Sequence, residues 1–292
     1  MKVFISGASG LVGGNCYRYF KEKGWNVIGS HLSYPLDYTV LFDTLNPKKK
    51  ENFDLEAFSP DYILHCGALT WVDYCEDHEE ESYQKTVQST KNLIGIAERT
   101  GAKLIFISTD YVFDGANGPY DELHDVNPIS IYGRHKLKGE ELSLASNPEN
   151  LSIRITNVYG REARNKNFIM RLVDNINKGE EMELKLPFDQ YATPVNAYDI
   201  ARSLYLLISD NKSGIYNIAS TDYVNRVQLA QKILQYFPSD KVKIVPVSTE
   251  TINPPADRPL QGGLKTGKFL SEYSDFEFTN VDDFLNDLKT EL

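Results

Sequence analysis

The sequence predicts an α/β protein: a doubly wound parallel sheet (Rossmann-like) with a smaller C-terminal substrate lobe. Short continuous apolar runs alternate with helical segments through the first half of the chain, which is typical of parallel strands covered by helices on both faces. A glycine-rich turn directly follows the first apolar run and opens a helix, as in dinucleotide-binding units. The regular alternation weakens after residue 160. We therefore expect a dinucleotide-binding domain over 1–160 and a mainly substrate-binding lobe over 161–292, with part of 190–220 packing back on the first domain.

Each expected element follows from a local pattern. Short apolar runs bounded by glycine or polar residues predict strands at 3–5, 25–28, 61–66, 103–108, 151–155 and 214–220. Apolar residues that recur every three or four positions predict helices at 11–23, 79–100, 132–145, 165–179, 195–209 and 226–237. The polar stretch 31–53 predicts a loop with a short helix, and the three prolines and two glycines of 252–263 predict an extended loop.

Composition and charge restrict the class of partner. The 292 residues carry a formal net charge of −10, whereas nucleic acids and anionic membranes bind basic surfaces. No apolar stretch approaches the roughly 18 residues of a membrane span, and the first residues lack a signal-peptide pattern. We therefore expect a cytoplasmic protein with neither a nucleic-acid nor a membrane partner, and the sequence leaves a homodimer open. Cys16, Cys66 and Cys75 lack CxxC spacing and show no ligand spacing with the five histidines, so we expect reduced thiols and no metal site.

The glycine-rich turn reads GASGLVG and places Gly7, Gly10 and Gly13 between the first strand and the first helix. Glycines permit close backbone approach, and a helix N-terminus presents free N–H groups and the positive end of its dipole. Both features suit a pyrophosphate. A plain tight turn is the alternative, which the position immediately after the first strand disfavours. We therefore predict that a dinucleotide cofactor binds here.

The end of the second strand bears on the choice of cofactor. An acidic residue there would bind the ribose 2′-hydroxyl of NAD. This sequence has Ser30 and His31 instead, with no carboxylate to repel a 2′-phosphate and no arginine to hold one. The pattern favours NADP(H), to which Ser30 and His31 could contribute contacts, and leaves NAD(H) as the second choice.

A tyrosine and a lysine stand one helical turn apart. Tyr132 and Lys136, in YGRHK, are i and i+4 on an expected helix, about 5–6 Å apart at Cβ. A free tyrosine has a pKa near 10, and a neighbouring ammonium lowers it, which makes the phenol useful for proton transfer. The alternative is an ordinary stacked pair at an exposed helix start. Ser108 and Thr109 supply hydroxyls at the end of the fourth strand, at the sheet edge where open α/β sheets bind ligands.

Taken together, these motifs resemble the extended short-chain dehydrogenase/reductases, and most closely the dTDP-4-dehydrorhamnose reductase family. The resemblance spans nearly the whole chain. Its motifs are GASGLVG, STDYVFDG, YGRHKLKGE and RITNVYG, followed by DQYATPVNAYDIA (189–201) and RPLQGG (258–263). It implies NAD(P)H-dependent reduction of the 4-keto group of a nucleotide-activated deoxysugar, most simply of dTDP-4-dehydro-L-rhamnose to dTDP-L-rhamnose.

The resemblance also implies roles for single residues. The catalytic set would be Thr109, Tyr132 and Lys136, the last two also contacting the cofactor. Further cofactor contacts would come from Gly10, Leu11 and Val12 at the pyrophosphate, Asp54 and Leu55 at the adenine, and Ala68, Leu69 and Thr70 on the inner side, besides Gly7, Gly13, Ser30 and His31. The substrate would contact Thr70, Val72, Thr109, Asp110, Tyr111 and Asn157. Arg258, in a proline-flanked loop, could hold a diphosphate bidentately or form an ordinary interdomain pair.

Two positions depart from the family pattern. Thr86 stands where the superfamily often has an asparagine, and Asn157 stands where the rhamnose enzyme has a tryptophan near the sugar. These departures keep a reductase or epimerase for another nucleotide sugar as an alternative. The family also includes NADP-binding relatives such as the regulatory β subunit of methionine adenosyltransferase, so a non-catalytic regulatory subunit is a further alternative. The complete Thr-Tyr-Lys set argues against that reading, because a pure binder needs no activated phenol.

Overall fold

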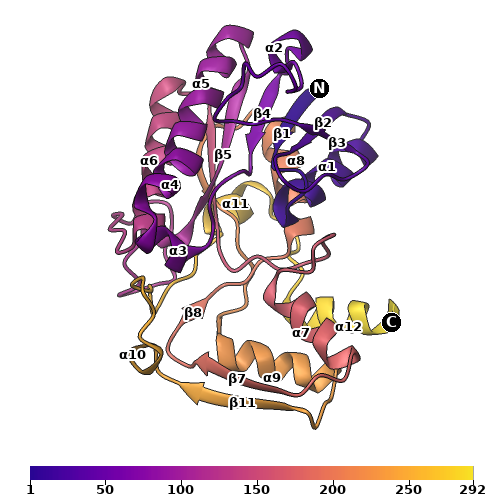
Figure 1. Cartoon of the computed structure of the whole chain (residues 1–292), viewed down its shortest axis with the longest axis vertical. Coiled ribbons are helices and arrows are strands. Elements are labelled where there is room, and N and C mark those ends of the chain that lie inside the picture. Colours follow the sequence, from indigo (N-terminus) through magenta and orange to yellow (C-terminus); the bar gives the residue numbers. More distant parts are fainter. Residues whose placement is uncertain (292) are drawn as a thin grey trace.

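The structure, a computed structural model, describes residues 1–291 and is built around a seven-stranded parallel sheet (Figure 1). The strand order is β3-β2-β1-β4-β5-β6-β9, and every pair is parallel. The strands are β1 (Lys2–Ser6), β2 (Asn26–His31), β3 (Thr39–Leu41), β4 (Tyr62–His65), β5 (Lys103–Thr109), β6 (Leu151–Ile155) and β9 (Gly214–Asn217). The strand order reverses between β1 and β4, which opens a crevice at their carboxyl ends. The predicted doubly wound fold is confirmed.

Helices cover both faces of this sheet. Helices α1 (Leu11–Glu22) and α8 (Ala197–Ser209) pack on the face that receives Val3 and Ile5. Helix α5 (Ser89–Thr100) packs on the opposite face, which receives Phe4, and α6 (Ile131–Ser146) lies beside it. Because successive side chains of a strand point to opposite faces, the apolar run of β1 is buried on both sides.

The expected helix over 79–100 is divided. It consists of α4 (Glu79–Tyr83), a π-helical turn (Gln84–Gln88) and α5. Thr90 donates its hydroxyl to the Thr86 carbonyl at 2.7 Å, and such a side-chain bond competes with the helical backbone ladder. Thr86, one of the two departures from the family pattern, therefore lies in an irregular, buried turn of this helix.

The polar stretch 31–53 contains a strand that the sequence did not predict. Strand β3 is three residues long and is formed by its pairing with β2. Because this contact is non-local and the strand is short, the sequence contains no long apolar run that would predict it. The short helix expected within 31–53 does not form there, where turns follow β3. The next helix is α2 (Leu55–Phe58), just after this stretch. A further short helix, α3 (Val72–Asp77), follows β4.

The second half of the chain returns to the sheet and also builds a lobe of its own. Strand β9 completes the sheet and α8 packs on α1, while a separate apolar core forms among the lobe elements, below the sheet in Figure 1. The elements of this half are α7 (Phe168–Asn177), β7 (Met182–Pro187), β8 (Tyr191–Ala192), β10 (Val224–Asn225), α9 (Arg226–Tyr236), β11 (Val242–Val247), α10 (Thr249–Ile252), α11 (Gly267–Glu272) and α12 (Val281–Glu291). The domain bounds 1–160 and 161–292 stay a prediction.

Residues 253–263 run without a helix or regular strand, as their prolines predict. The Tyr120 N–H donates to the Gly263 carbonyl at 3.0 Å, and the Gly262 N–H donates to the Tyr191 carbonyl at 3.1 Å. The loop thus connects the segment after β5 with the segment at β8. Across residues 1–291, none of the helices combines the length and apolarity needed to cross a bilayer.

Candidate active site

The glycine turn lies at the carboxyl end of β1 and is tightly packed at Gly7 and Gly13. Gly7 has φ 81°, a left-handed conformation that glycine adopts at no steric cost. A Cβ on Gly13 would come within 2.5 Å of the Gly7 carbonyl oxygen. Gly10 is the N-cap of α1, so Leu11 and Val12 begin the helix and the first N–H groups face the sheet edge. This tight cradle at a helix N-terminus fits a pyrophosphate.

The neighbouring strand ends carry the residues expected beside the cofactor. Ser30 is buried and its carbonyl accepts the Ala8 N–H at 2.8 Å. His31 Nδ1 lies 2.8 Å from Thr39 Oγ1. After β4, Ala68 and Leu69 are half-buried. Thr70 lines the large cavity described below and Val72 opens α3, so the segment after β4 runs along the crevice.

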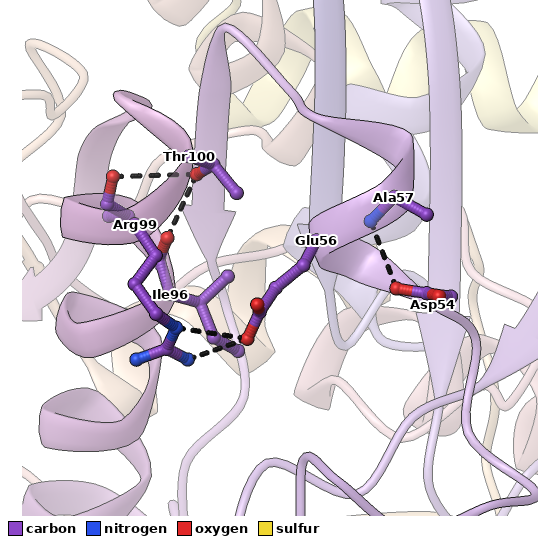
Figure 2. A network of polar contacts seen from close by, with 7 residues as sticks. Asp54, Glu56, Ala57, Ile96, Arg99 and Thr100 are labelled. Carbon is purple, nitrogen blue, oxygen red and sulfur yellow. Dashed lines mark hydrogen bonds and ion pairs between the residues drawn. The ribbon is translucent and has the colours of Figure 1, made fainter.

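Asp54 and Leu55 occupy a place other than the one the resemblance implies. Leu55 is 2% exposed and packs in the core under α5. Asp54 caps α2 by accepting the Ala57 N–H at 2.9 Å, and Glu56 pairs with Arg99 near the end of α5 (Figure 2). These contacts give Asp54 a capping role and Leu55 a packing role, which departs from the expected adenine contact.

Polar residues also follow the end of β3, at the sheet edge where β2 ends. Asp43 follows β3 by two residues, beside the end of β2, and its carboxylate accepts the Leu45 N–H at 2.9 Å. Sequence analysis missed Asp43 because β3 was not predicted. The signal available was the short run Thr39–Leu41 followed by Phe42 and an aspartate.

The three expected catalytic residues converge between β5 and α6. Thr109 is the last residue of β5, and Tyr132 lies in the first turn of α6, which Ser130 caps through the Gly133 N–H at 3.1 Å. Burial raises the pKa of Tyr132 well above its usual value, and a hydrogen bond with the Thr109 side chain opposes that rise. The phenol therefore carries its proton at neutral pH.

The ammonium of Lys136, which the sequence predicts to act on Tyr132, is held against strand β5. Lys136 is 4% exposed, and its ammonium donates to the Ile107 carbonyl and lies 4.3 Å from the centre of the Phe106 ring. Burial lowers the pKa of Lys136 to about 8, opposed by Cys66 and Glu140. We expected this ammonium to lower the Tyr132 pKa, but the structure instead gives the main lowering effect to the Thr109 side chain.

Asp110 was expected to contact the substrate, but its carboxylate is buried and serves a structural role. It is 4% exposed, and its carboxylate accepts hydrogen bonds from the Thr156 hydroxyl at 2.6 Å and the Gly263 N–H at 3.2 Å. Burial raises its pKa, and these bonds oppose the rise. Asp110 thus joins the ends of β5 and β6 to the loop 253–263, because a buried carboxylate needs such partners.

A cavity of about 640 Å³ lies between the sheet edge and the lobe. It has an apolar part formed by Phe168, Ile169, Leu186, Pro187, Ile252 and Pro254. Its charged residues are four cations and one carboxylate: Lys166, Arg171, Arg226, Arg258 and Asp73. This excess of positive charge and the adjoining apolar wall suit a ligand with a phosphate-bearing part and a planar or apolar part.

Arg226 is a site residue that sequence analysis missed. Its guanidinium donates to Asn157 Oδ1 at 2.8 Å and lies 5.5 Å from the Phe168 ring centre. Asn157 has φ 40°, a left-handed conformation that asparagine tolerates better than most residues. Arg258, by contrast, pairs with Asp73 at 2.5 Å across the cavity, so the expected diphosphate contact by Arg258 stays a prediction.

Tyr111 connects the catalytic set with the cationic cavity. Its ring packs edge-on against Tyr132, with centroids 5.5 Å apart. Burial raises the pKa of Tyr111 to about 12, and Arg258 and Arg226 oppose that rise. The charges of both arginines therefore act on this phenol, and both arginines line the cavity. Within residues 1–291, no group of three His, Cys, Asp or Glu side chains is placed to hold a metal ion.

The parallel sheet, the glycine cradle and the Thr-Tyr-Lys set define the class of extended short-chain dehydrogenase/reductases. The chain belongs to the family described as RmlD substrate binding domain, which matches residues 1–288. This finding confirms the family that the sequence motifs indicate.

Relatives and solved structures are similar over nearly the whole chain. The probable low-salt glycan biosynthesis reductase Agl14 of Haloferax volcanii is 29% identical, over 97% of this chain and 96% of the relative. Methionine adenosyltransferase 2 subunit beta of Danio rerio is 26% identical, over 91% of this chain and 83% of the relative.

Two solved structures add to this comparison. A dTDP-4-dehydrorhamnose reductase of Clostridium acetobutylicum is 31% identical with a TM-score of 0.81, covering 99% of this chain and 98% of that one. The dTDP-4-dehydrorhamnose reductase of Bacillus anthracis, in complex with NADP, is 26% identical with a TM-score of 0.85, covering 100% of this chain and 99% of that one. The family is thus one of nucleotide-sugar reductases that also includes a subunit of another enzyme.

Proposed function

We propose that this protein reduces the keto group of a nucleotide-activated deoxysugar with NAD(P)H, and that the 4-keto group of dTDP-4-dehydro-L-rhamnose is its first candidate substrate. One observation carries the proposal. The Thr109–Tyr132 pair adjoins, through Tyr111, a cavity with four cations and an apolar wall. A proton donor beside a phosphate-binding cavity is the arrangement that this reaction requires.

The chain offers a fitting place for the cofactor. The tight turn at Gly7 and Gly13 and the free N–H groups of α1 suit its pyrophosphate. In this proposal Lys136 binds a ribose hydroxyl by turning its ammonium from the Ile107 carbonyl toward the cofactor. The chemistry that such a cofactor supplies is hydride transfer to the keto carbon. NADP(H) is the preferred form, supported by the absence of a carboxylate at Ser30 and His31 and by the NADP bound to the Bacillus anthracis relative.

Three side chains then donate the proton and stabilise the negative charge that develops on the carbonyl oxygen. Tyr132, protonated because burial raises its pKa, donates its proton to the carbonyl oxygen. Thr109 donates a hydrogen bond to the same oxygen and stabilises it as negative charge develops. Lys136 is mostly charged at neutral pH, since its pKa is about 8, and the same turn toward the cofactor would bring its charge to the phenolate that Tyr132 becomes.

The arginines hold the substrate in this proposal. Arg226 presents a planar guanidinium to the cavity and suits a diphosphate oxygen pair. Arg258 joins it by exchanging its Asp73 partner for the diphosphate. The apolar wall beside Phe168 and Leu186 receives the base.

Two other functions remain candidates. Arg226 bound to Asn157 shapes the sugar side of the cavity, which favours a reductase or epimerase for a different nucleotide sugar. The similarity to methionine adenosyltransferase 2 subunit beta favours a cofactor-binding regulatory subunit. The latter requires an obligate enzyme partner and no turnover of any ketosugar.

A substrate panel separates these candidates. Purified protein is mixed with a series of nucleotide 4-ketosugars, with NADPH and NADH in parallel, and oxidation of the reduced nicotinamide is followed. Turnover of dTDP-4-dehydro-L-rhamnose above all others supports the proposal, and turnover of another sugar identifies the second candidate. Tyr132→Phe is the matched control, because it removes only the phenolic hydroxyl. Turnover by wild type and variant at equal rates would refute the proposed proton donor.

A further inference from the structure

The segment 160–167, which follows β6, crosses the crevice toward the loop that follows β2. We propose that Arg164 in this segment binds the 2′-phosphate of NADP(H) and thereby selects NADP(H) over NAD(H). The inference rests on the proposed dinucleotide site and assigns a selectivity residue within it.

The second strand by itself leaves this selection unexplained. Its last residues, Ser30 and His31, carry no carboxylate against a 2′-phosphate and no permanent cation for one. Ser30 is 1% exposed, and His31 Nδ1 is engaged with Thr39 Oγ1 at 2.8 Å. A phosphate at this edge therefore needs positive charge from another part of the chain.

Arg164 supplies a cation at this edge. Its guanidinium carbon lies 5.1 Å from the centre of the Tyr34 ring, and Tyr34 stands three residues beyond the end of β2. In this fold the adenosine ribose binds at the end of the second strand. A guanidinium over an aromatic face makes a cation–π contact that engages none of its N–H donors, and these donors match a phosphate bidentately.

The segment is anchored where it crosses α1. Asn15 on α1 donates its side-chain amide to the Arg161 carbonyl at 3.1 Å. The carboxylate of Glu162 is occupied by the Asn167 N–H at 2.7 Å. These anchors hold the backbone on both sides of Arg164, and the Tyr34 ring is the contact over which its side chain lies.

The charges around Arg164 support an anionic ligand. Among residues 1–291, no carboxylate lies within 4 Å of the guanidinium of Arg164 or of Arg18 on α1. Arg18 follows Tyr17 on α1, and the Tyr17 ring stacks on Tyr38 of the same loop with centroids 4.5 Å apart. The Arg18 charge also opposes the burial-induced rise in the Tyr38 pKa. Two arginines without acidic partners thus flank the ribose edge, and their positive potential favours a phosphate.

Binding of adenosine fragments tests the proposal without any turnover. The affinities of adenosine 2′,5′-bisphosphate and adenosine 5′-monophosphate are measured by calorimetry for wild type, Arg164→Gln and Arg164→Lys. The wild type should prefer the bisphosphate. Arg164→Gln should weaken bisphosphate binding about tenfold through the lost charge-assisted hydrogen bonds and leave monophosphate binding within about twofold. Arg164→Lys should fall between them, since lysine keeps the charge but loses the bidentate geometry.

Arg161→Gln is the matched control, because it removes a cation from the same segment that pairs with Glu291 and should leave both affinities unchanged. Unchanged monophosphate binding shows that Arg164→Gln is folded. If Arg164→Gln preferred the bisphosphate as strongly as the wild type does, the proposed role of Arg164 would be overturned. A wild type that binds the two fragments with equal affinity would overturn it as well. A wild type that binds neither fragment, NAD nor NADP would instead refute the dinucleotide site itself.

Discussion

Replacing Lys136 by methionine measures the electrostatic cost that the active site imposes on the fold. Burial lowers the Lys136 pKa from 10.5 to about 8, and each pKa unit corresponds to about 1.4 kcal/mol. Holding the charged lysine in the folded, cofactor-free protein therefore costs about 3 kcal/mol at neutral pH. Methionine keeps a long apolar chain beside Phe106 but loses the hydrogen bond to the Ile107 carbonyl. We expect Lys136→Met to raise the free energy of unfolding by about 1–3 kcal/mol and to abolish turnover.

The pH dependence of this difference has a definite sign. The folded-state pKa of Lys136 lies below its unfolded value, so the unfolded chain binds more protons between about pH 8 and 10.5. The stability cost is therefore complete below pH 8 and disappears as the pH rises through this window. The advantage of Lys136→Met over wild type should shrink accordingly.

Urea unfolding without cofactor, at neutral pH and inside this window, supplies the measurement. Lys138→Met is the control, because Lys138 is on the same helix with a side chain 55% exposed, and it should change stability by less than about 0.5 kcal/mol. A destabilised Lys136→Met, or a stability difference that does not vary with pH, would refute the reasoning.

The remaining predictions concern other contacts of the site. Thr109→Ala removes the hydroxyl beside Tyr132 and should lower kcat about 100-fold with NADP binding unchanged in a titration; a normal kcat would contradict its role. Arg226→Gln should raise KM for the nucleotide sugar about tenfold, and an effect confined to the KM for NADPH would place Arg226 outside the substrate site. Glu140→Gln leaves Arg154, 3% exposed and 2.6 Å from Glu140, as an uncompensated buried charge. It should lower the free energy of unfolding by about 3–5 kcal/mol in urea, and a loss below about 1 kcal/mol, the value of an exposed pair, would contradict this.

Local patterns were sufficient for the parts of the site that lie within one turn or one helix. Gly7, Gly10 and Gly13 form the cradle as their spacing predicts, because the backbone geometry of a tight turn depends on a few adjacent residues. Tyr132 and Lys136 lie on one helix, as i and i+4 residues must. The sheet, too, followed from the alternation of apolar runs and helices.

Non-local contacts account for what the sequence did not show. Strand β3 forms through its pairing with β2. Because the sequence did not predict β3, it also did not predict that Asp43 lies at the edge of the sheet. Arg226 is at the start of α9 in sequence but reaches Asn157 and the cavity in space. Asp110 looked like a substrate contact beside Thr109, yet Thr156 and Gly263 occupy its carboxylate.

By itself, the sequence determined the class of fold and the family, because hydrophobic periodicity and short motifs encode these within a few residues. Only the tertiary structure decided which side chains remain available to ligands. Lys136 lies against β5 and Asp110 is enclosed by three elements, whereas Arg226 faces the cavity. The physical reason is that burial and hydrogen-bond partners set the charge state of a polar group and the number of its donors and acceptors that stay unoccupied. Burial and partners both depend on residues distant in the chain.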